Sequence, residues 1–423
     1  MTAQPSEVPA LKAALLAAWA RSETLFGLLT EGALMDRPIG LRHPFVFYLG
    51  HLPAFMWNQL GGLVGAERFQ ADFDQLFERG IDPLDEECAE AATITCWPAI
   101  EAIDAYRRRV QEWVLEESFD AVGAVDDVLA ERWRIHHIAL EHELMHHETL
   151  LYMLQELGLD RKVQGELPSA VIGAARAASE PIRIPGGRTV LGGDFDAQFG
   201  WDNEFPAQSV DVAAFTLDSL PVTVAEYAAY LAETGAARPH NWVEGPDGLC
   251  VRSMFALVPI EDVPGWPVQA SHAEATAYAA WRGGRLPTEA ELQHAAFGTP
   301  DGGMRAYPWG EQAPEGGVHG VFDFCQWSPG PVGAHPAGAS AFGAQELVGN
   351  GWEWTSTPFR PLPGFTAYAR TYAGYSADFF DDEHYVVFGG SWATDARLLR
   401  RTFRNWYQGH YPYVFSSFRV VTG

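Results

Sequence analysis

The amino-acid sequence predicts an α+β protein with two domains, a four-helix bundle followed by a loop-rich domain. The chain has 423 residues, which is too long for one ordinary hydrophobic core and suits two. Apolar side chains recur at helical spacing in the first part of the chain, whereas glycine, proline and aromatic residues become frequent from Ile182 onward. We therefore expect the bundle over 1–160, a linker over 161–181 and the second domain over 182–423.

The bundle is expected to contain four amphipathic helices, because four apolar segments alternate with breaker residues. Pro44 precedes the second segment, and Gly158 is expected to end the fourth segment as a C-cap. The four expected helices span 9–30, 45–64, 97–116 and 125–157.

The second domain is expected to depend on packed aromatic side chains more than on regular elements. Short β-like runs stand among its long loops at 189–191 and 385–388. Two helices are expected, at 224–234 and 272–282.

The composition is typical of a globular protein of the cytoplasm. Apolar residues make up 47% and charged residues 20% of the chain, which is normal for such a protein. No apolar run reaches the roughly 18 residues of a membrane span, and the N-terminus lacks the pattern of a signal peptide. The formal charge of −27 would repel a phosphate backbone. We therefore expect a cytoplasmic protein that binds neither nucleic acid nor membranes.

The cysteines are scattered rather than paired in a CxxC motif. In a chain without an export signal, such cysteines are reduced thiols. A copper or zinc thiolate site is therefore not expected. The cysteines are Cys88, Cys96, Cys250 and Cys325.

The strongest chemical signal is the run EHELMHHE at 141–148 of the fourth expected helix. His142 and His146 are four residues apart, so they share one helix face with their Cβ atoms about 5–6 Å apart and can bind one metal ion. Glu148 is turned about 200° from His146 around the helix axis, so Glu148 is a poor candidate for direct ligation to the same ion. Three further histidines also point away from this face: His136, His137 and His147.

The third ligand is expected from another helix. His51 is a lone histidine in the apolar segment 45–64, which should pack inward. A histidine pair at helical spacing is often only a core or surface feature, but a third histidine in the same bundle favours a metal site. Three neutral imidazoles leave up to three positions of an octahedral ion open for O2 and a substrate. This fits Fe(II), with Zn(II), Ni(II) and Co(II) as alternatives.

A series of short motifs runs through the second domain. The motifs are FGWDNE at 199–204, PVT at 221–223, GGRLPTEAE at 283–291, YPWG at 307–310, GNGWEW at 349–354, GGSW at 389–392 and FR at 418–419. Their order resembles the formylglycine-generating (sulfatase-modifying-factor) fold, which is C-type-lectin-like, over about 240 residues. Formylglycine-generating enzymes bind copper through two cysteines. This chain has no such pair near its C-terminus, so aldehyde formation on sulfatases is not expected.

A histidine-bearing bundle of the DinB type fused to this second fold resembles the ergothioneine-pathway sulfoxide synthases and the related ovothiol-pathway and selenoneine synthases. The family's iron ligands are the histidine of a GH pair and the two histidines of HxxxHxE. They correspond to His51, His142 and His146. The resemblance implies an Fe(II) enzyme that uses O2 as co-substrate and acts on hercynine, the trimethylammonium betaine of histidine.

Two further segments resemble substrate-handling parts of that family. The run YAGYS at 372–376 is similar to a YxxYS segment, in which the first tyrosine supplies a proton or hydrogen atom during oxygen reduction. This implies a catalytic role for Tyr372 and a pocket-shaping role for Tyr375, although both tyrosines could simply be packing residues. The run RNW at 404–406 is similar to the segment that holds the trimethylammonium group. Asn405 would supply an amide dipole there, and Trp406 a cation–π contact.

The donor of sulfur or selenium is indicated by the residues after the RNW segment. Enzymes of the family that use γ-glutamylcysteine carry an Asp and an Arg where this chain has Tyr407 and Tyr411, and a Gln where it has Met145. The run YQGHYPY at 407–413 resembles instead the cysteine-using ovothiol-pathway and fungal enzymes. Aromatic rings with scattered hydrogen-bonding groups also suit a neutral sugar, and compact bacterial selenoneine synthases take a selenosugar.

We therefore favour a selenoneine synthase that joins a selenosugar to hercynine. The alternatives within the family are an ergothioneine-type enzyme that uses cysteine or γ-glutamylcysteine, and an ovothiol-type enzyme that acts on histidine. Two classes outside the family stay open, because fold alone does not fix function. A DinB-type thiol transferase would use zinc or nickel without O2, and a binding module would show no turnover.

Overall fold

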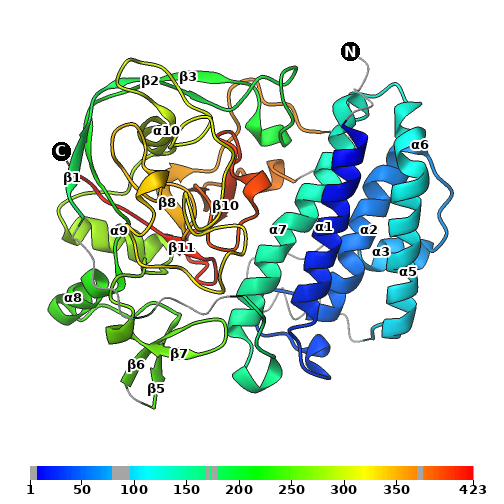
Figure 1. Ribbon diagram of the computed structural model, residues 1–423, viewed down its shortest axis with the longest axis horizontal. Helices are drawn as coiled ribbons and strands as arrows, with labels where there is room; N and C mark the ends of the chain where they lie inside the picture. Colours follow the sequence, from blue (N-terminus) through cyan, green and yellow to red (C-terminus); the bar gives the residue numbers. More distant parts are fainter. Residues whose placement is uncertain are drawn as a thin grey trace. The chain divides into compact units, whose positions relative to one another are not determined.

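The computed structural model describes residues 7–78, 96–167, 172, 179–246, 248–368 and 375–422. They belong to two compact units, which divide between Gly165 and Glu166. The first unit is helical, and the second combines short strands with helices (Figure 1). The expected α+β class is therefore confirmed. Nearly half of the expected linker, residues 168–171 and 173–178, lies outside the described residues.

In the described residues, the first unit is built around four long helices, of which α1 and α2 pack against α7 and α2 also packs against α5. Figure 1 shows these helices running side by side. Its helices are α1 (Val8–Phe26), α2 (Phe45–Val64), α3 (Ala71–Leu76), α5 (Ile100–Trp113), α6 (Phe119–Gly123) and α7 (Arg134–Glu156). A π-helical turn (Val114–Ser118) joins α5 to α6, and 3-10 turns lie at Ala33–Met35, Glu131–Trp133 and Leu159–Arg161.

Helix α2 begins and ends at the expected residues because both ends carry local signals. Pro44 is the N-cap in an extended conformation, and Gly65 ends the helix in the left-handed region with φ 67°. Every side chain from Phe45 to Trp57 is buried. A helix that is apolar all round must lie inside the bundle, so His51 is held in the core.

Helix α7 differs from the expected fourth helix at both ends. It begins at Arg134 rather than at residue 125, because Arg132 and Trp133 adopt left-handed conformations with φ 54° and 57°. The Trp133 ring packs against Phe119, with centroids 5.4 Å apart. The expectation of a glycine C-cap was wrong: Gly158 has φ −54° and follows an extended Leu157, so it is not left-handed.

The described part of the second unit contains four small sheets, with strand orders β1-β4-β12, β10-β9-β8-β11, β2-β3 and β5-β6-β7. In the largest of them, β10 pairs antiparallel with β9, which places Trp406 opposite Val386. The strands are β1 (Pro181–Ile184), β2 (Gly187–Leu191), β3 (Gln208–Val212), β4 (Phe215–Asp218), β5 (Trp242–Gly245), β6 (Gly248–Arg252), β7 (Leu257–Pro259), β8 (Trp352–Pro358), β9 (His384–Phe388), β10 (Asn405–Gln408), β11 (Ser416–Ser417) and β12 (Val421–Thr422).

Three helices accompany these sheets: α8 (Val224–Thr234), α9 (His272–Trp281) and α10 (Glu289–Phe297). The first coincides with an expected helix, and the second ends one residue before its expected end. Helix α10 was not expected, although Thr288 and Glu291 form a capping box at its start. That S/T-x-x-E pattern is a helix-start signal that the sequence analysis overlooked.

Buried ion pairs connect the short motifs of the second unit. Arg404 of the RNW motif donates to both carboxylate oxygens of Glu289 in the TEAE motif, at 2.7 and 3.1 Å. Arg419 of the FR motif binds Glu353 of the WEW motif. These side chains are at most 7% exposed. The motifs are therefore far apart in the chain but adjacent in the core.

Within the described part of the chain, no helix is long and apolar enough to cross a membrane. Among the described residues, Cys96, Cys250 and Cys325 form no disulfide bond. Cys88 lies outside the described residues.

Candidate functional site

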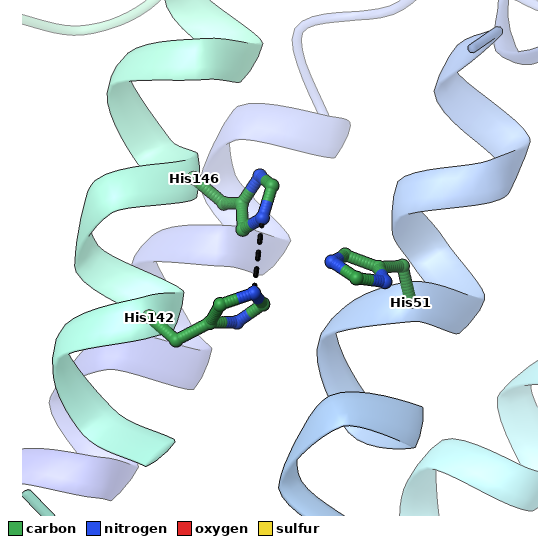
Figure 2. A group of neighbouring side chains, drawn as sticks. All are labelled: His51, His142 and His146. Carbon is green, nitrogen blue, oxygen red and sulfur yellow. Dashed lines mark hydrogen bonds between the residues drawn. The ribbon is translucent and has the colours of Figure 1, made fainter. Parts of the chain in front are cut away.

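Three histidine side chains meet in the core of the first unit. His51 comes from α2, and His142 and His146 come from α7, one turn apart on the same helix face. Figure 2 shows the His51 ring pointing from its own helix towards the other two. One ring nitrogen of each lies within 4.8 Å of the others. Among the described residues this is the only group of three or more His, Cys, Asp or Glu side chains so arranged.

Burial keeps these imidazoles neutral. It lowers the pKa of His51 to about 4, and it lowers the pKa values of His142 and His146 well below the ordinary value. A neutral imidazole offers one nitrogen lone pair to a metal. The Nε2 atoms of His142 and His146 are 3.2 Å apart, and His146 Nδ1 has no hydrogen-bond partner among the described residues. Converging, uncharged nitrogen donors fit a divalent transition metal.

Aromatic side chains of α2 frame the three imidazoles. Phe47, His51 and Phe55 are spaced four residues apart and therefore share a helix face. The Phe47 ring stacks on His51 with centroids 5.0 Å apart, and the Phe55 ring stacks on His142 with centroids 3.4 Å apart and an interplanar angle of 4°. These contacts hold the ring planes in place. Phe47 and Phe55 were not singled out from the sequence, although their spacing from His51 could have indicated them.

Three other polar side chains of α7 contact residues elsewhere in the bundle. His136 Nε2 lies 2.9 Å from Ser118 Oγ. Ser22 of α1 donates to Glu143, and its Oγ lies 2.8 Å from His147 Nε2. Burial also raises the pKa of Glu143 to about 7. These histidines, like the buried Glu148, are not members of the three-histidine group.

A second cluster lies in the other unit, around Trp406 on β10. The Trp406 ring stacks on Phe359 with centroids 4.0 Å apart and an interplanar angle of 7°. Tyr375 and Phe379 lie beside it, at 5.3 and 5.6 Å. Asn405 Oδ1 accepts a hydrogen bond from the Trp406 backbone N–H at 2.9 Å. The structure thus brings together three of the expected substrate-binding residues and adds Phe359 and Phe379, which the sequence analysis missed.

Tyr375 is held by the FGWDNE motif. Its ring stacks on Trp201 with centroids 4.0 Å apart. The next residue, Ser376, donates to Asp202 and accepts from Asn203 Nδ2 at 3.0 Å. The motif at 199–204 therefore holds the segment that carries Tyr375 in place. Tyr372 lies outside the described residues.

Two of the three expected donor-binding residues lie together in the second unit, and the third lies on α7. The Tyr407 and Tyr411 rings are parallel, with centroids 6.0 Å apart, and Tyr411 contacts Tyr413 at 5.1 Å. Tyr407 directly follows Trp406 on β10. Met145 is half-buried on α7, directly before His146.

Comparison with known proteins agrees with this architecture. Residues 14–150 match the DinB superfamily, and residues 169–423 match the sulfatase-modifying factor enzyme 1-like domain. Hercynine oxygenase of Mycolicibacterium smegmatis is 38% identical over 67% of this chain and 70% of its own length. The chain belongs to the ergothioneine- and ovothiol-type sulfoxide synthase family. This is a family of enzymes.

Two further relatives show how the family's parts match. Ergothioneine biosynthesis protein 1 of Neurospora crassa is 32% identical over 93% of this chain and 55% of its own length. The chain thus spans about half the length of that relative. Formylglycine-generating enzyme of Mycobacterium tuberculosis is 32% identical over 43% of this chain and 75% of its own length. The first match covers nearly the whole chain, whereas the second covers less than half of it.

Proposed function

We propose that this protein is a non-heme iron enzyme that uses O2 to join a chalcogen donor to the imidazole ring of hercynine. The observation that carries this proposal is the convergence of three neutral imidazoles, two of them buried and His146 half-buried, in the bundle of a sulfoxide synthase. Relatives whose names refer to hercynine and to ergothioneine support the substrate.

His51, His142 and His146 would hold Fe(II) through one nitrogen each. When bound, the ion supplies the redox chemistry that O2 requires and leaves open positions for substrates. In the bundle, the Phe47 ring covers one face of the His51 imidazole and the Phe55 ring covers one face of the His142 imidazole. The two rings exclude water from these faces. The exclusion of water prevents side reactions of oxygen.

The overall reaction balances for a donor R–XH, where X is sulfur or selenium. A ring C–H bond of hercynine and the X–H bond of the donor break, and C–X and X=O bonds form. Carbon–chalcogen coupling and oxidation of X each release two electrons. These four electrons reduce O2, of which one oxygen atom enters the product and the other leaves as water.

Trp406 and Asn405 are proposed to hold the trimethylammonium group of hercynine. A quaternary ammonium has no N–H to donate, so it is recognised by aromatic faces and by dipoles. Trp406 stands in a cluster of aromatic rings with Tyr375, Phe359 and Phe379, and Asn405 precedes it on the same strand. This concentration of π-systems is what such a cation requires.

We propose a selenosugar as the donor. Tyr407 and Tyr411 stand where enzymes of the family that use γ-glutamylcysteine carry charged residues, which would bind a dianionic donor. Cysteine is the second candidate, and two observations favour it. The match to the Neurospora crassa protein covers 93% of this chain. In addition, the Arg42 guanidinium acts on the His146 imidazole, whose pKa is lowered first by burial, then by His51 and then by Arg42. A cation near the three histidines suits a donor with a carboxylate.

The test is anaerobic reconstitution with Fe(II), followed by O2, hercynine and one donor at a time, with products identified by mass spectrometry. The donors are a 1-selenosugar, cysteine and γ-glutamylcysteine, and histidine replaces hercynine in a parallel series. We expect a selenium-containing hercynine adduct only with the selenosugar. A cysteine adduct at a comparable rate would instead identify an ergothioneine-type enzyme, and an adduct only with histidine an ovothiol-type enzyme.

Absence of any adduct despite bound iron would overturn the proposal. Activity of a zinc or nickel form without O2 would indicate a thiol transferase. Full ligand affinity of the metal-free protein without turnover would indicate a binding module.

Tyr372→Phe is expected to reduce product yield while leaving the affinity for hercynine unchanged. The phenol is proposed to supply a proton or hydrogen atom, and phenylalanine keeps the ring without the O–H group. General acid–base groups typically contribute about 10²–10⁴-fold in rate. Single-turnover product yield and calorimetric hercynine binding would be measured side by side, with Tyr375→Phe as the matched control. Wild-type yield in Tyr372→Phe would show that the assigned role is wrong.

A further inference from the structure

His51 donates a hydrogen bond to a backbone carbonyl. Its Nδ1 lies 2.8 Å from the carbonyl oxygen of Phe77, and both residues are fully buried. A carbonyl oxygen only accepts hydrogen bonds, so the imidazole proton is on Nδ1 and the lone pair is on Nε2. The partner of one ring nitrogen thus decides which nitrogen is available to a metal.

The Phe77 carbonyl is available because it stands at the end of a helix. Helix α3 ends at Leu76, and Phe77 is its C-cap residue. The last carbonyls of a helix have no partner within the helix. In this buried position the imidazole N–H of His51 provides the partner.

Gly50 allows Phe77 to come this close. A Cβ atom at Gly50 would lie 2.6 Å from three carbon atoms of the Phe77 ring, well inside van der Waals contact. The ring has little room to move, because it also packs against Phe47, Phe73 and Trp97, with centroids 5.7–6.2 Å away. This close approach leaves no room for a side chain at this position of α2.

We propose that Gly50 and Phe77 are positioning residues for the metal centre. The Phe77 ring lies against the bare backbone of Gly50, and this contact holds the Phe77 carbonyl on His51 Nδ1. The carbonyl then fixes the tautomer and the orientation in which His51 Nε2 faces His142 and His146. This inference rests on the proposed metal site and adds the residues that prepare it.

The test compares Co(II) affinities, measured by competition with a chelator, and the visible spectra of the Co(II) forms. Gly50→Ala is expected to weaken Co(II) binding by about 10–100-fold, as is typical when an outer partner of a ligand is lost. Gly62→Ala is the matched control on the same helix, because a Cβ there would meet nothing within 4 Å. It is expected to leave the affinity and the spectrum unchanged.

A double variant separates the steric cause from a general effect of alanine. In the presence of Phe77→Ala, which removes the ring but keeps the carbonyl, Gly50→Ala is expected to change the affinity by less than about 3-fold. Equal losses from Gly50→Ala with and without Phe77→Ala would overturn the proposal. So would wild-type affinity in Gly50→Ala.

The tautomer is tested without any destabilising change. In ¹⁵N-histidine-labelled metal-free protein, His51 is expected to carry its proton on Nδ1, with the signals assigned by their absence in His51→Gln. A proton on Nε2 would overturn the inference even if Gly50→Ala fails to fold. If the wild-type protein binds no Co(II) or Fe(II), the proposed metal centre is wrong, whereas the NMR result still decides how His51 is held.

Discussion

Replacement of His142 by alanine is expected to abolish Fe(II) binding and product formation together. Two imidazoles remain in His142→Ala, and His51 and His146 come from different helices, so the ion loses its chelating pair on α7. Loss of a ligand should exceed the roughly 10–100-fold effect of losing an outer partner. Iron content after anaerobic loading and product yield per iron would be measured on the same preparation.

His136→Ala is the matched control for this experiment. His136 is also a fully buried histidine of α7, where it stacks on Phe119 with centroids 3.9 Å apart, but it belongs to no metal-ligand group. We expect His136→Ala to lower the melting temperature while one iron per chain is retained. Wild-type iron content in His142→Ala, or equal loss of iron in both variants, would contradict the assignment.

Arg419→Met is expected to destabilise the second unit by about 3–5 kcal/mol, because it leaves a buried charge without its partner. Glu353 is 1% exposed, and Arg419 is fully buried beside it. Arg419 also donates to the backbone carbonyls of Asp218 at 3.2 Å and Gln345 at 2.9 Å. The free energy of unfolding would be obtained from urea denaturation followed by circular dichroism.

Two controls separate the buried charge from other effects. Arg188→Met breaks an ion pair whose side chains are 71% and 82% exposed, and it should cost less than about 1 kcal/mol. The double replacement of Arg419 and Glu353 by methionine should cost less than Arg419→Met alone, because no unpaired charge remains. If Arg419→Met costs no more than Arg188→Met, the ion pair does not support the fold as described.

The pH dependence of this variant has a definite sign. Burial raises the pKa of Glu353 even with Arg419 beside it. Without Arg419, the folded protein still binds a proton at Glu353 more tightly than the unfolded chain does. Stability is then lost as the pH rises above the ordinary glutamate pKa. The deficit of Arg419→Met should therefore be larger at about pH 8 than at about pH 5.

Several elements could be predicted from the sequence because their signals are local. Helix α8 begins after Thr223, which forms a capping box with Glu226, and ends at Gly235 with φ 68°. The pairing of His142 with His146 follows from helical spacing alone. The start of α7 could not be predicted in this way, because nothing in the apolar pattern shows that Arg132 and Trp133 leave the helical region. Their conformation depends on where the Trp133 ring packs.

The candidate site likewise has parts that local sequence signals predict and parts that only tertiary packing decides. Residue type, spacing and motif order were enough to select His51 from one segment, His142 and His146 from another, and Trp406 from a third. Its supporting contacts were not visible in the sequence: the Phe77 carbonyl on His51 and the Phe359 ring on Trp406. The period of a helix or strand fixes which of its own residues share a face. Which distant segment covers that face depends on how the chain packs, and the packing cannot be predicted from the periodicity of the sequence.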